Sequence, residues 1–145
     1  GLFVVGSRAG DRRNAMTANW VIQIGSAPKL VGVSVEKEAV THDLIAGSRA
    51  FVVNLLDRDD RAIVRKFTKP VEVEGATLNG FAFHDGRTGA PVLDQAVAYI
   101  ECEVRDELDC GEHTLFVGEV VDAAFQGDES TDVLRMEDTR MNYGG

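Results

Sequence analysis

Segments that alternate apolar and polar residues constrain the fold of this chain more than any other feature of its sequence. In LVGVSVE, Val31, Val33 and Val35 recur at every second position. Successive side chains of a β-strand point to opposite faces, so this spacing predicts a strand with one buried face. YIECEVRDEL and HTLFVGEVVDAAF show the same period over longer stretches, and the short connection DCGE between them predicts a hairpin.

Shorter patterns predict the remaining strands. Trp20, Ile22 and Ile24 share one face in NWVIQIG, and SAPK then turns the chain. A strand is expected to begin over 2–6, followed by a turn in SRAGDRRN. AFVVNLL reads as a continuous apolar strand. The side chains expected on one face of YIECEVRDEL are Ile100, Cys102, Val104 and Leu108.

Two short helices and one irregular region complete the prediction. Thr41 is expected to cap the first helix, which ends near Gly47. Asp57 is expected to cap the second helix, and Pro70 ends it. The region 68–95 is rich in glycine, so we expect a functional or covering loop there.

Many strands, few helices and no regular alternation between the two favour an antiparallel β-barrel with helical additions. The chain has 145 residues, of which 44% are hydrophobic and 27% charged. That length predicts a single domain spanning 1–145, with enough chain to bury a core without disulfides.

Composition and motif spacing exclude several classes of function. The net charge of −9 argues against a nucleic-acid binder, and the apolar runs fall short of the roughly 18 residues of a membrane span. His42, His84 and His113 lack metal-ligand spacing, and Cys102 and Cys110 do not form a C-x-x-C pair, so no metal site is expected. We expect two buried free thiols, which suit the reducing cytoplasm. The chain starts without an initiator Met, so we interpret it as a fragment.

Polar residues interrupt the strand pattern between 14 and 45. Ser34 and Lys37 close one predicted strand, and Thr41 begins the helix that follows. A helix N-terminus exposes unpaired N–H groups and favours an anion, and a lysine adds charge. A phosphate site is therefore one interpretation. The other is that Lys37 is solvated and Thr41 only caps its helix.

Several segments together resemble the flavin reductase-like, FMN-binding split-barrel family. They are NAMTANW, SAPKLVGVSVEKEAVTHDLI, AFVVNLL, GAPVL, AYIECEV and GEHTLFVGEVV, in that order along the chain. The closing RMNYGG resembles the branch that contains flavoredoxins and ferric reductase-type proteins. The resemblance implies an antiparallel split β-barrel of Greek-key type, assembled as a homodimer with FMN near the interface.

The resemblance also implies which residues meet the flavin ring. Met16, Thr17, Ala18 and Asn19 would approach it through backbone N–H groups and small side chains, with Trp20 nearby. Bulky residues there would hold a flat ring away. From the residues alone, Thr17 and Asn19 equally suit a turn that needs no ligand.

By the same resemblance, the FMN phosphate meets Ser34, Lys37 and Thr41, and His42 adjoins them. His113 would lie at the open face of the flavin and position the nicotinamide, because hydride transfer needs no acid or base. The alternative for His113 is a hydrogen bond to the hairpin turn.

The function implied is that of an oxidoreductase. It would pass electrons from NADH or NADPH through FMN to free flavin, ferric iron or a partner monooxygenase. The alternative is a flavoredoxin-like electron carrier that a redox protein partner reduces. Two strands, AFVVNLL and LFVGEVV, are apolar on both faces and support the homodimer independently, because one barrel has only one interior.

Overall fold

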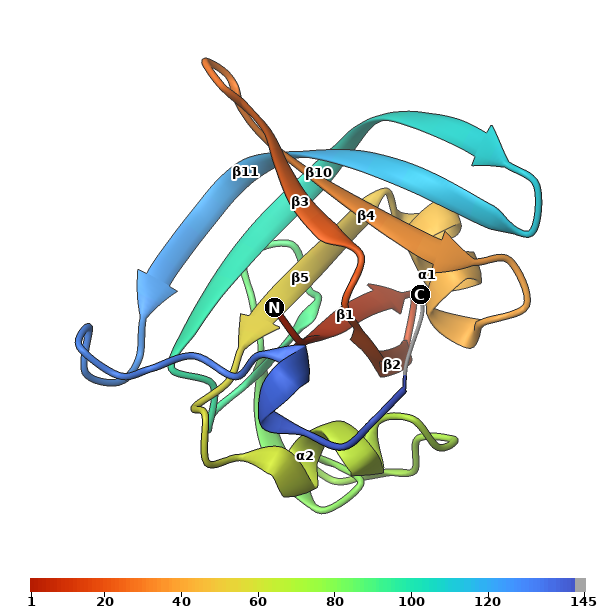
Figure 1. Cartoon of the computed structure of the whole chain (residues 1–145). Helices are drawn as coiled ribbons and strands as arrows, with labels where there is room; N and C mark the ends of the chain where they lie inside the picture. The colour runs from red at the N-terminus through yellow and green to blue at the C-terminus, as the bar shows by residue number, and fades with distance from the viewer. Residues whose placement is uncertain (143–145) are drawn as a thin grey trace.

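The computed structural model describes residues 1–142 and confirms an antiparallel barrel (Figure 1). The last three residues of RMNYGG lie outside the described part. One sheet has seven strands in the order β2-β1-β5-β10-β11-β4-β3. Their bounds are β1 Phe3–Ala9, β2 Arg12–Ala18, β3 Val21–Ser26, β4 Lys29–Glu36, β5 Ala50–Leu55, β10 Ala98–Cys110 and β11 His113–Phe125.

The barrel interior follows the predicted alternation. Val33 and Val35 of β4 are fully buried, and β5 is buried along almost its whole length. Phe51 of β5 and Phe116 of β11 lie in the same core cluster. Helix α1 (Val40–Ser48) adds Ile45 to this cluster, so the helix closes one end of the barrel.

The first hairpin differs from its prediction. SRAGDRRN is not an extended turn, because β1 continues to Ala9 and β2 begins at Arg12. Only Gly10 and Asp11 make the connection, with Gly10 at a φ of 59°. Pairing along the register, including Ser7 opposite Asn14, outweighs the turn-forming composition of the segment.

Both helix caps were predicted wrongly. The N-cap of α1 is Ala39, which makes no side-chain cap bond, and Thr41 is a buried residue of the first turn. Helix α2 (Arg61–Lys66) has Asp60 at its N-cap, whereas the carboxylate of Asp57 accepts the Asp59 N–H at 2.9 Å in the preceding turn.

The region 68–95 is more regular than predicted. It forms four short strands, paired in the order β6-β7-β8-β9, and their glycines sit in the turns. The bounds are β6 Val73–Glu74, β7 Thr77–Leu78, β8 Phe81–Asp85 and β9 Pro91–Leu93. The buried carboxylate of Glu101 anchors the last turn, accepting the N–H groups of Arg87 and Thr88 at 2.8 and 2.9 Å.

A bulge in the β10–β11 hairpin places one predicted core residue on the surface. DCGE makes the predicted connection between β10 and β11, and Ile100, Cys102 and Val104 face the barrel core as expected. A register shift between Val104 and Asp106 then reverses the alternation, so Leu108 is exposed and lies opposite Leu115.

The two cysteines are free, as predicted, but only one is buried. Burial raises the pKa of the Cys102 thiol to about 12, and the neighbouring Glu101 adds to the shift. Cys110 is exposed at the tip of the hairpin. None of the helices in the described part is long and apolar enough to cross a membrane.

Candidate ligand-binding site

Thr17 fastens helix α2 to the end of β2. Its hydroxyl donates to the carbonyl of Val64 at 2.6 Å, and its N–H donates to the carbonyl of Phe67 at 3.1 Å. Carbonyls in the last turn of a helix lack partners within the helix, so β2 supplies them here. The segment after α2 is thereby held beside Met16.

A polar cavity of about 250 Å³ lies between β2, the start of α1 and the segment after α2. Asn14 and Thr41 form a link across it, because the Asn14 Nδ2 donates to the Thr41 hydroxyl at 3.3 Å. The other lining residues are Ala15, Met16, Glu36, Ala39, Val40, Phe67, Thr68, Lys69 and Pro70.

Lys69, and not Lys37, is the cation that lines this cavity. The Lys37 ammonium bonds the Asp109 carboxylate at 2.7 Å, at the tip of the β10–β11 hairpin. This bond, together with the Gly111 N–H, lowers the pKa of Asp109. A lysine does line the cavity where a phosphate could bind, but it is Lys69 and not the expected Lys37.

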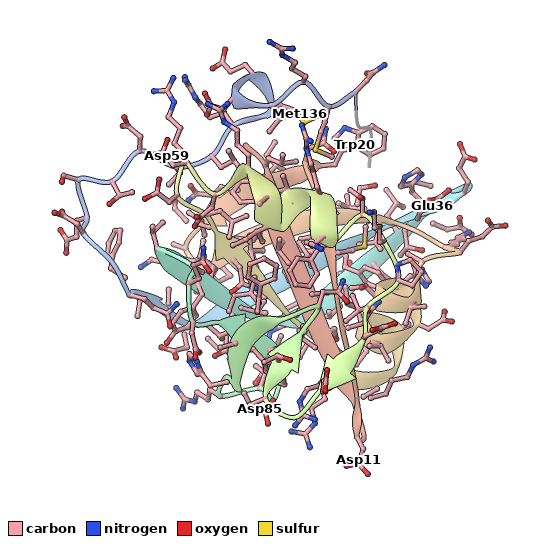
Figure 2. All side chains as sticks on the ribbon, turned by 90° about the horizontal axis from the view of Figure 1, so that it is seen from below. Asp11, Trp20, Glu36, Asp59, Asp85 and Met136 are labelled. Atoms are coloured by element: carbon pink, nitrogen blue, oxygen red, sulfur yellow. The ribbon has the colours of Figure 1, made fainter. Side chains whose placement is uncertain are left out.

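His113 lies next to the cavity on the outer face of the barrel. Glu36 lines the cavity and pairs with His113 in the register of β4 and β11. The His113 ring lies 5.1 Å from the ring of Trp20, which is 47% exposed. The buried Nε2 of His113 has no hydrogen-bond partner within the described residues. Trp20 and Glu36 lie toward the same side of the molecule in Figure 2.

Ser34 and Asn19 lie beside Trp20 and His113, and these four residues form one edge of the barrel's outer face. The Ser34 N–H donates to the Trp20 carbonyl at 3.0 Å, which joins β4 to the segment that carries Asn19 and Trp20. Both Ser34 and Asn19 are half-buried. This edge therefore continues from the polar cavity to the tryptophan and histidine rings.

His42 and Ala18 have other positions. The His42 Nε2 is 2.8 Å from the Thr114 hydroxyl, and its ring packs 5.2 Å from that of Phe116, so it joins α1 to β11. Ala18 is fully buried in the barrel core. No part of Ala18 is therefore exposed to a ligand in this structure.

The structure thus brings together Met16, Asn19, Trp20, Ser34, Thr41 and His113, and it engages Lys37 and His42 elsewhere. Sequence reasoning missed Asn14, Thr68 and Lys69 as lining residues. Asn14 sits within the NAMTANW motif, and Thr68 and Lys69 come from RKFTKP, where polar and basic residues directly precede the helix-ending Pro70. Within 1–142, no group of three or more His, Cys, Asp or Glu residues could hold a metal ion.

Comparison with known proteins points to one family. Residues 1–145 match the family described as Flavin reductase like domain. The ferric-chelate reductase (NAD(P)H) of Archaeoglobus fulgidus is 38% identical over 125 residues, covering 85% of this chain and 74% of that protein. The high molecular weight rubredoxin of Moorella thermoacetica is 33% identical over 135 residues. That match covers 90% of this chain but only 59% of the rubredoxin.

Solved structures agree with these matches. The NADH:FAD oxidoreductase SgcE6 of Streptomyces globisporus C-1027 superposes with a TM-score of 0.79 at 28% identity, covering 92% of this chain and 78% of that one. A second structure of SgcE6, in complex with NAD and FAD fragments, gives a TM-score of 0.78 with the same identity and coverage.

The contacts of Thr17 predict a measurable structural role. Thr17→Val keeps the side-chain shape but removes the bond to the Val64 carbonyl, so unfolding free energy should fall by about 1–3 kcal/mol in urea denaturation. Thr77→Val is the control, because the Thr77 hydroxyl donates to the Glu74 carbonyl at an exposed position and its loss should cost less than about 0.5 kcal/mol. Equal losses in the two variants would contradict this role.

Proposed function

Because the chain belongs to the flavin reductase like domain family, we propose that it is an oxidoreductase that passes electrons from NADH or NADPH through bound FMN to an acceptor. The observation that carries the proposal is the unpartnered Nε2 of His113 beside the exposed ring of Trp20, at the edge of a polar cavity. The ferric-chelate reductase (NAD(P)H) relative supports the use of a nicotinamide donor.

The residues present fit FMN in two parts. The polar cavity, at about 250 Å³, is below the roughly 300–1,000 Å³ of a whole small-molecule pocket, so we place only the phosphate end of FMN there. Lys69, Thr41 and Asn14 would hold the phosphate, and the first N–H groups of α1 would face it. Glu36 also lines the cavity and would face the ribityl hydroxyls.

The outer edge fits the flat ring. Trp20 and His113 form an aromatic surface, and Asn19 and Ser34 would supply polar contacts to the ring edge. The buried Nε2 of His113 would gain the partner that the protein does not provide. Met16 is half-buried, lines the polar cavity and would meet the ligand there. Thr17 and Ala18 are fully buried and would act by holding the strand behind the site.

Bound flavin supplies a ring that accepts a hydride, with its two electrons, from a reduced nicotinamide and passes the electrons on. The residues of this chain have the task of orientation. His113 would hold the nicotinamide at the open face, and no proton transfer is needed at that moment. Lys37 and His42 would act at longer range, by fixing the hairpin tip and α1 beside the site.

The first test concerns the phosphate. Lys69→Ala should weaken FMN binding about ten- to a hundredfold, because one charge-assisted contact of about 1.5–3 kcal/mol is lost. Riboflavin lacks the phosphate and should bind the variant and the original protein alike in fluorescence titrations. Lys66→Ala is the matched control on the same segment, and Lys37→Ala should fall between the two. An equal loss for FMN and riboflavin would show that Lys69 acts through the fold.

The second test concerns His113. His113→Ala should slow flavin reduction by NADH or NADPH in anaerobic stopped-flow, while FMN affinity falls by no more than about tenfold, since the one net hydrogen bond that Nε2 would make to the ring is worth about 0.5–1.5 kcal/mol. Reduction by dithionite bypasses the nicotinamide and should be unchanged. A loss of FMN affinity far beyond about tenfold, with reduction by NADH or NADPH unchanged once FMN is saturating, would instead show that His113 mainly holds the cofactor and does not position the nicotinamide.

We further propose a homodimer that uses the outer face of β3. Ile22 and Ile24 of β3 are 64% and 46% exposed, and Trp20, directly before the strand, is 47% exposed, so large apolar side chains gather on this face. A Cβ on Gly32 would meet Ile24 and Leu115, so the apolar face continues onto β4 and β11. A second copy would cover this face and lie next to His113.

Light scattering at low micromolar concentration tests the dimer. Ile22→Glu should produce monomers, because burying an unpaired carboxylate in an apolar interface is costly. Val73→Glu is the control, at a side chain that is 49% exposed on the separate small sheet. The original protein running as a monomer with full FMN affinity would refute the interface.

A second function is supported by one relative. The similarity to high molecular weight rubredoxin favours an electron carrier that a redox protein partner reduces. Flavin that stays oxidised when NADH or NADPH is added anaerobically would favour this carrier over the reductase. For either function, the free thiols Cys102 and Cys110 support a reducing, cytoplasmic location.

A further inference from the structure

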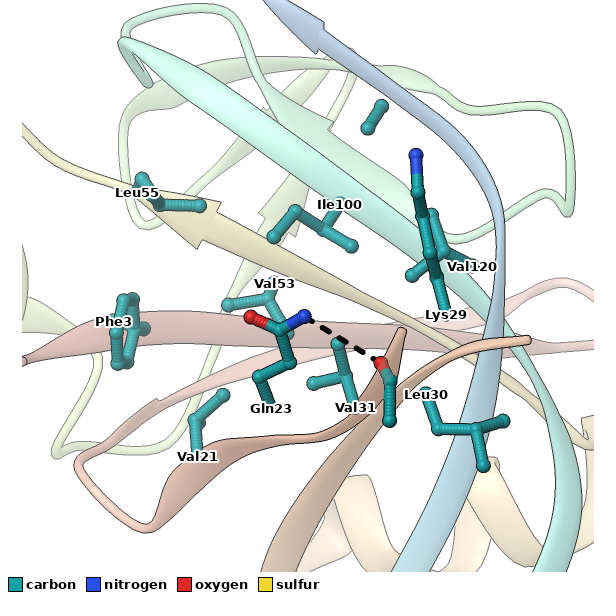
Figure 3. A pocket seen from close by; sticks show the side chains of 12 residues that line it. Phe3, Val21, Gln23, Lys29, Leu30, Val31, Val53, Leu55, Ile100 and Val120 are labelled. Carbon is teal, nitrogen blue, oxygen red and sulfur yellow. Dashed lines mark hydrogen bonds between the residues drawn. The ribbon is translucent and has the colours of Figure 1, made fainter. Parts of the chain in front are cut away.

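A second and larger cavity opens at the other end of the barrel (Figure 3). It has a volume of about 390 Å³ and receives side chains from β1, β3, β4, β5, β10 and β11. Its walls include Phe3, Val21, Val31, Val53, Ile100 and Val120. We call it the barrel mouth.

The position of the barrel mouth follows from the strand directions. Helix α1 joins the end of β4 to the start of β5, whereas the barrel mouth is lined by the start of β4 and the end of β5. It also uses the second half of β11, away from His113. The barrel mouth and the polar cavity therefore lie toward opposite ends of the barrel, whereas Val21 of the barrel mouth directly follows Trp20 along the chain.

The barrel mouth combines apolar walls with two polar groups at its edge. Gln23 and Lys29 reach it from the β3–β4 hairpin. The amide of Gln23 donates to the Gly25 carbonyl only at 3.5 Å, so it is readily exchanged for another acceptor. Among the described residues, the Lys29 ammonium forms no ion pair within 4.0 Å, in a chain with a net charge of −9.

We propose that the barrel mouth binds a small amphipathic carboxylate, with its apolar part inside and its carboxylate at Lys29. The cavity volume falls in the range of roughly 300–1,000 Å³ for small-molecule sites, which are mostly apolar with a few orienting polar groups. A cationic head group would be repelled by the Lys29 ammonium, and a neutral one would gain no ion pair there. An anionic head group would form an ion pair with the Lys29 ammonium.

The barrel mouth is also separate from the proposed dimer face. Along β3, Val21 and Gln23 line the barrel mouth, whereas Ile22 and Ile24 are exposed on the opposite side of the strand. A second copy seated on Ile22 and Ile24 therefore leaves the interior side of β3 facing the barrel mouth.

Calorimetric titration of the purified chain, saturated with FMN so that the flavin site is filled, tests the proposal. Hexanoate, octanoate and decanoate are the probes. Affinity should rise about fourfold per added methylene, since burying each is worth about 0.8 kcal/mol. Octanol and octyltrimethylammonium, with the same chain as octanoate but a neutral or cationic head, should bind more weakly than octanoate.

Two variants test whether octanoate binds in the barrel mouth. Lys29→Gln should weaken octanoate about two- to fivefold, the value of one surface ion pair, while Lys66→Gln leaves it unchanged. Ala123→Trp places a large ring at an exposed lining position and should abolish binding without altering FMN affinity. The proposal is overturned if no carboxylate binds, if the three head groups bind equally, or if Ala123→Trp has no effect. It is also overturned if decanoate dissociates the dimer, because the barrel mouth would then be part of the interface.

Discussion

The structure depends on one constraint, which is the register of β4 against β11. On the inner side of this pair, Val33, Val35 and Phe116 are fully buried, so a slip by one residue would expose the whole set. The outer side inherits that fixed position. His113 is thereby held opposite Glu36 at the edge of the polar cavity. The buried side chains that fix the register therefore also fix the position of His113 on the outer face.

The barrel end near α1 gathers the polar groups, although the chain as a whole is acidic. Thr17 ties α2 to β2, and this places Lys69 beside Thr41 and Asn14. Lys37 is instead used by Asp109 to hold the hairpin tip. A net charge of −9 is therefore compatible with a phosphate site, because a few local donors decide the affinity of an anion.

Sequence reasoning predicted what depends on short-range periodicity. The barrel strands, the free thiols and the likeness to the flavin reductase-like family follow from local patterns and are confirmed. Features set by distant partners were missed. Thr41 suits a cap by local rules but bonds Asn14, and the bulge after Val104 exposes Leu108. Lys69 lines the cavity because Thr17 of β2 bonds α2 and so positions the segment after it. That contact joins residues far apart in the sequence, so the local sequence pattern does not predict it.

We propose that the polar cavity and the Trp20–His113 edge together form one flavin site. Difference electron density from crystals of the FMN-loaded protein tests it most directly. We expect phosphate density within hydrogen-bonding distance of Lys69 and Thr41, and ring density against Trp20 with a polar contact to the His113 Nε2. Ring density in the barrel mouth, or phosphate density away from Lys69 and Thr41, would contradict it.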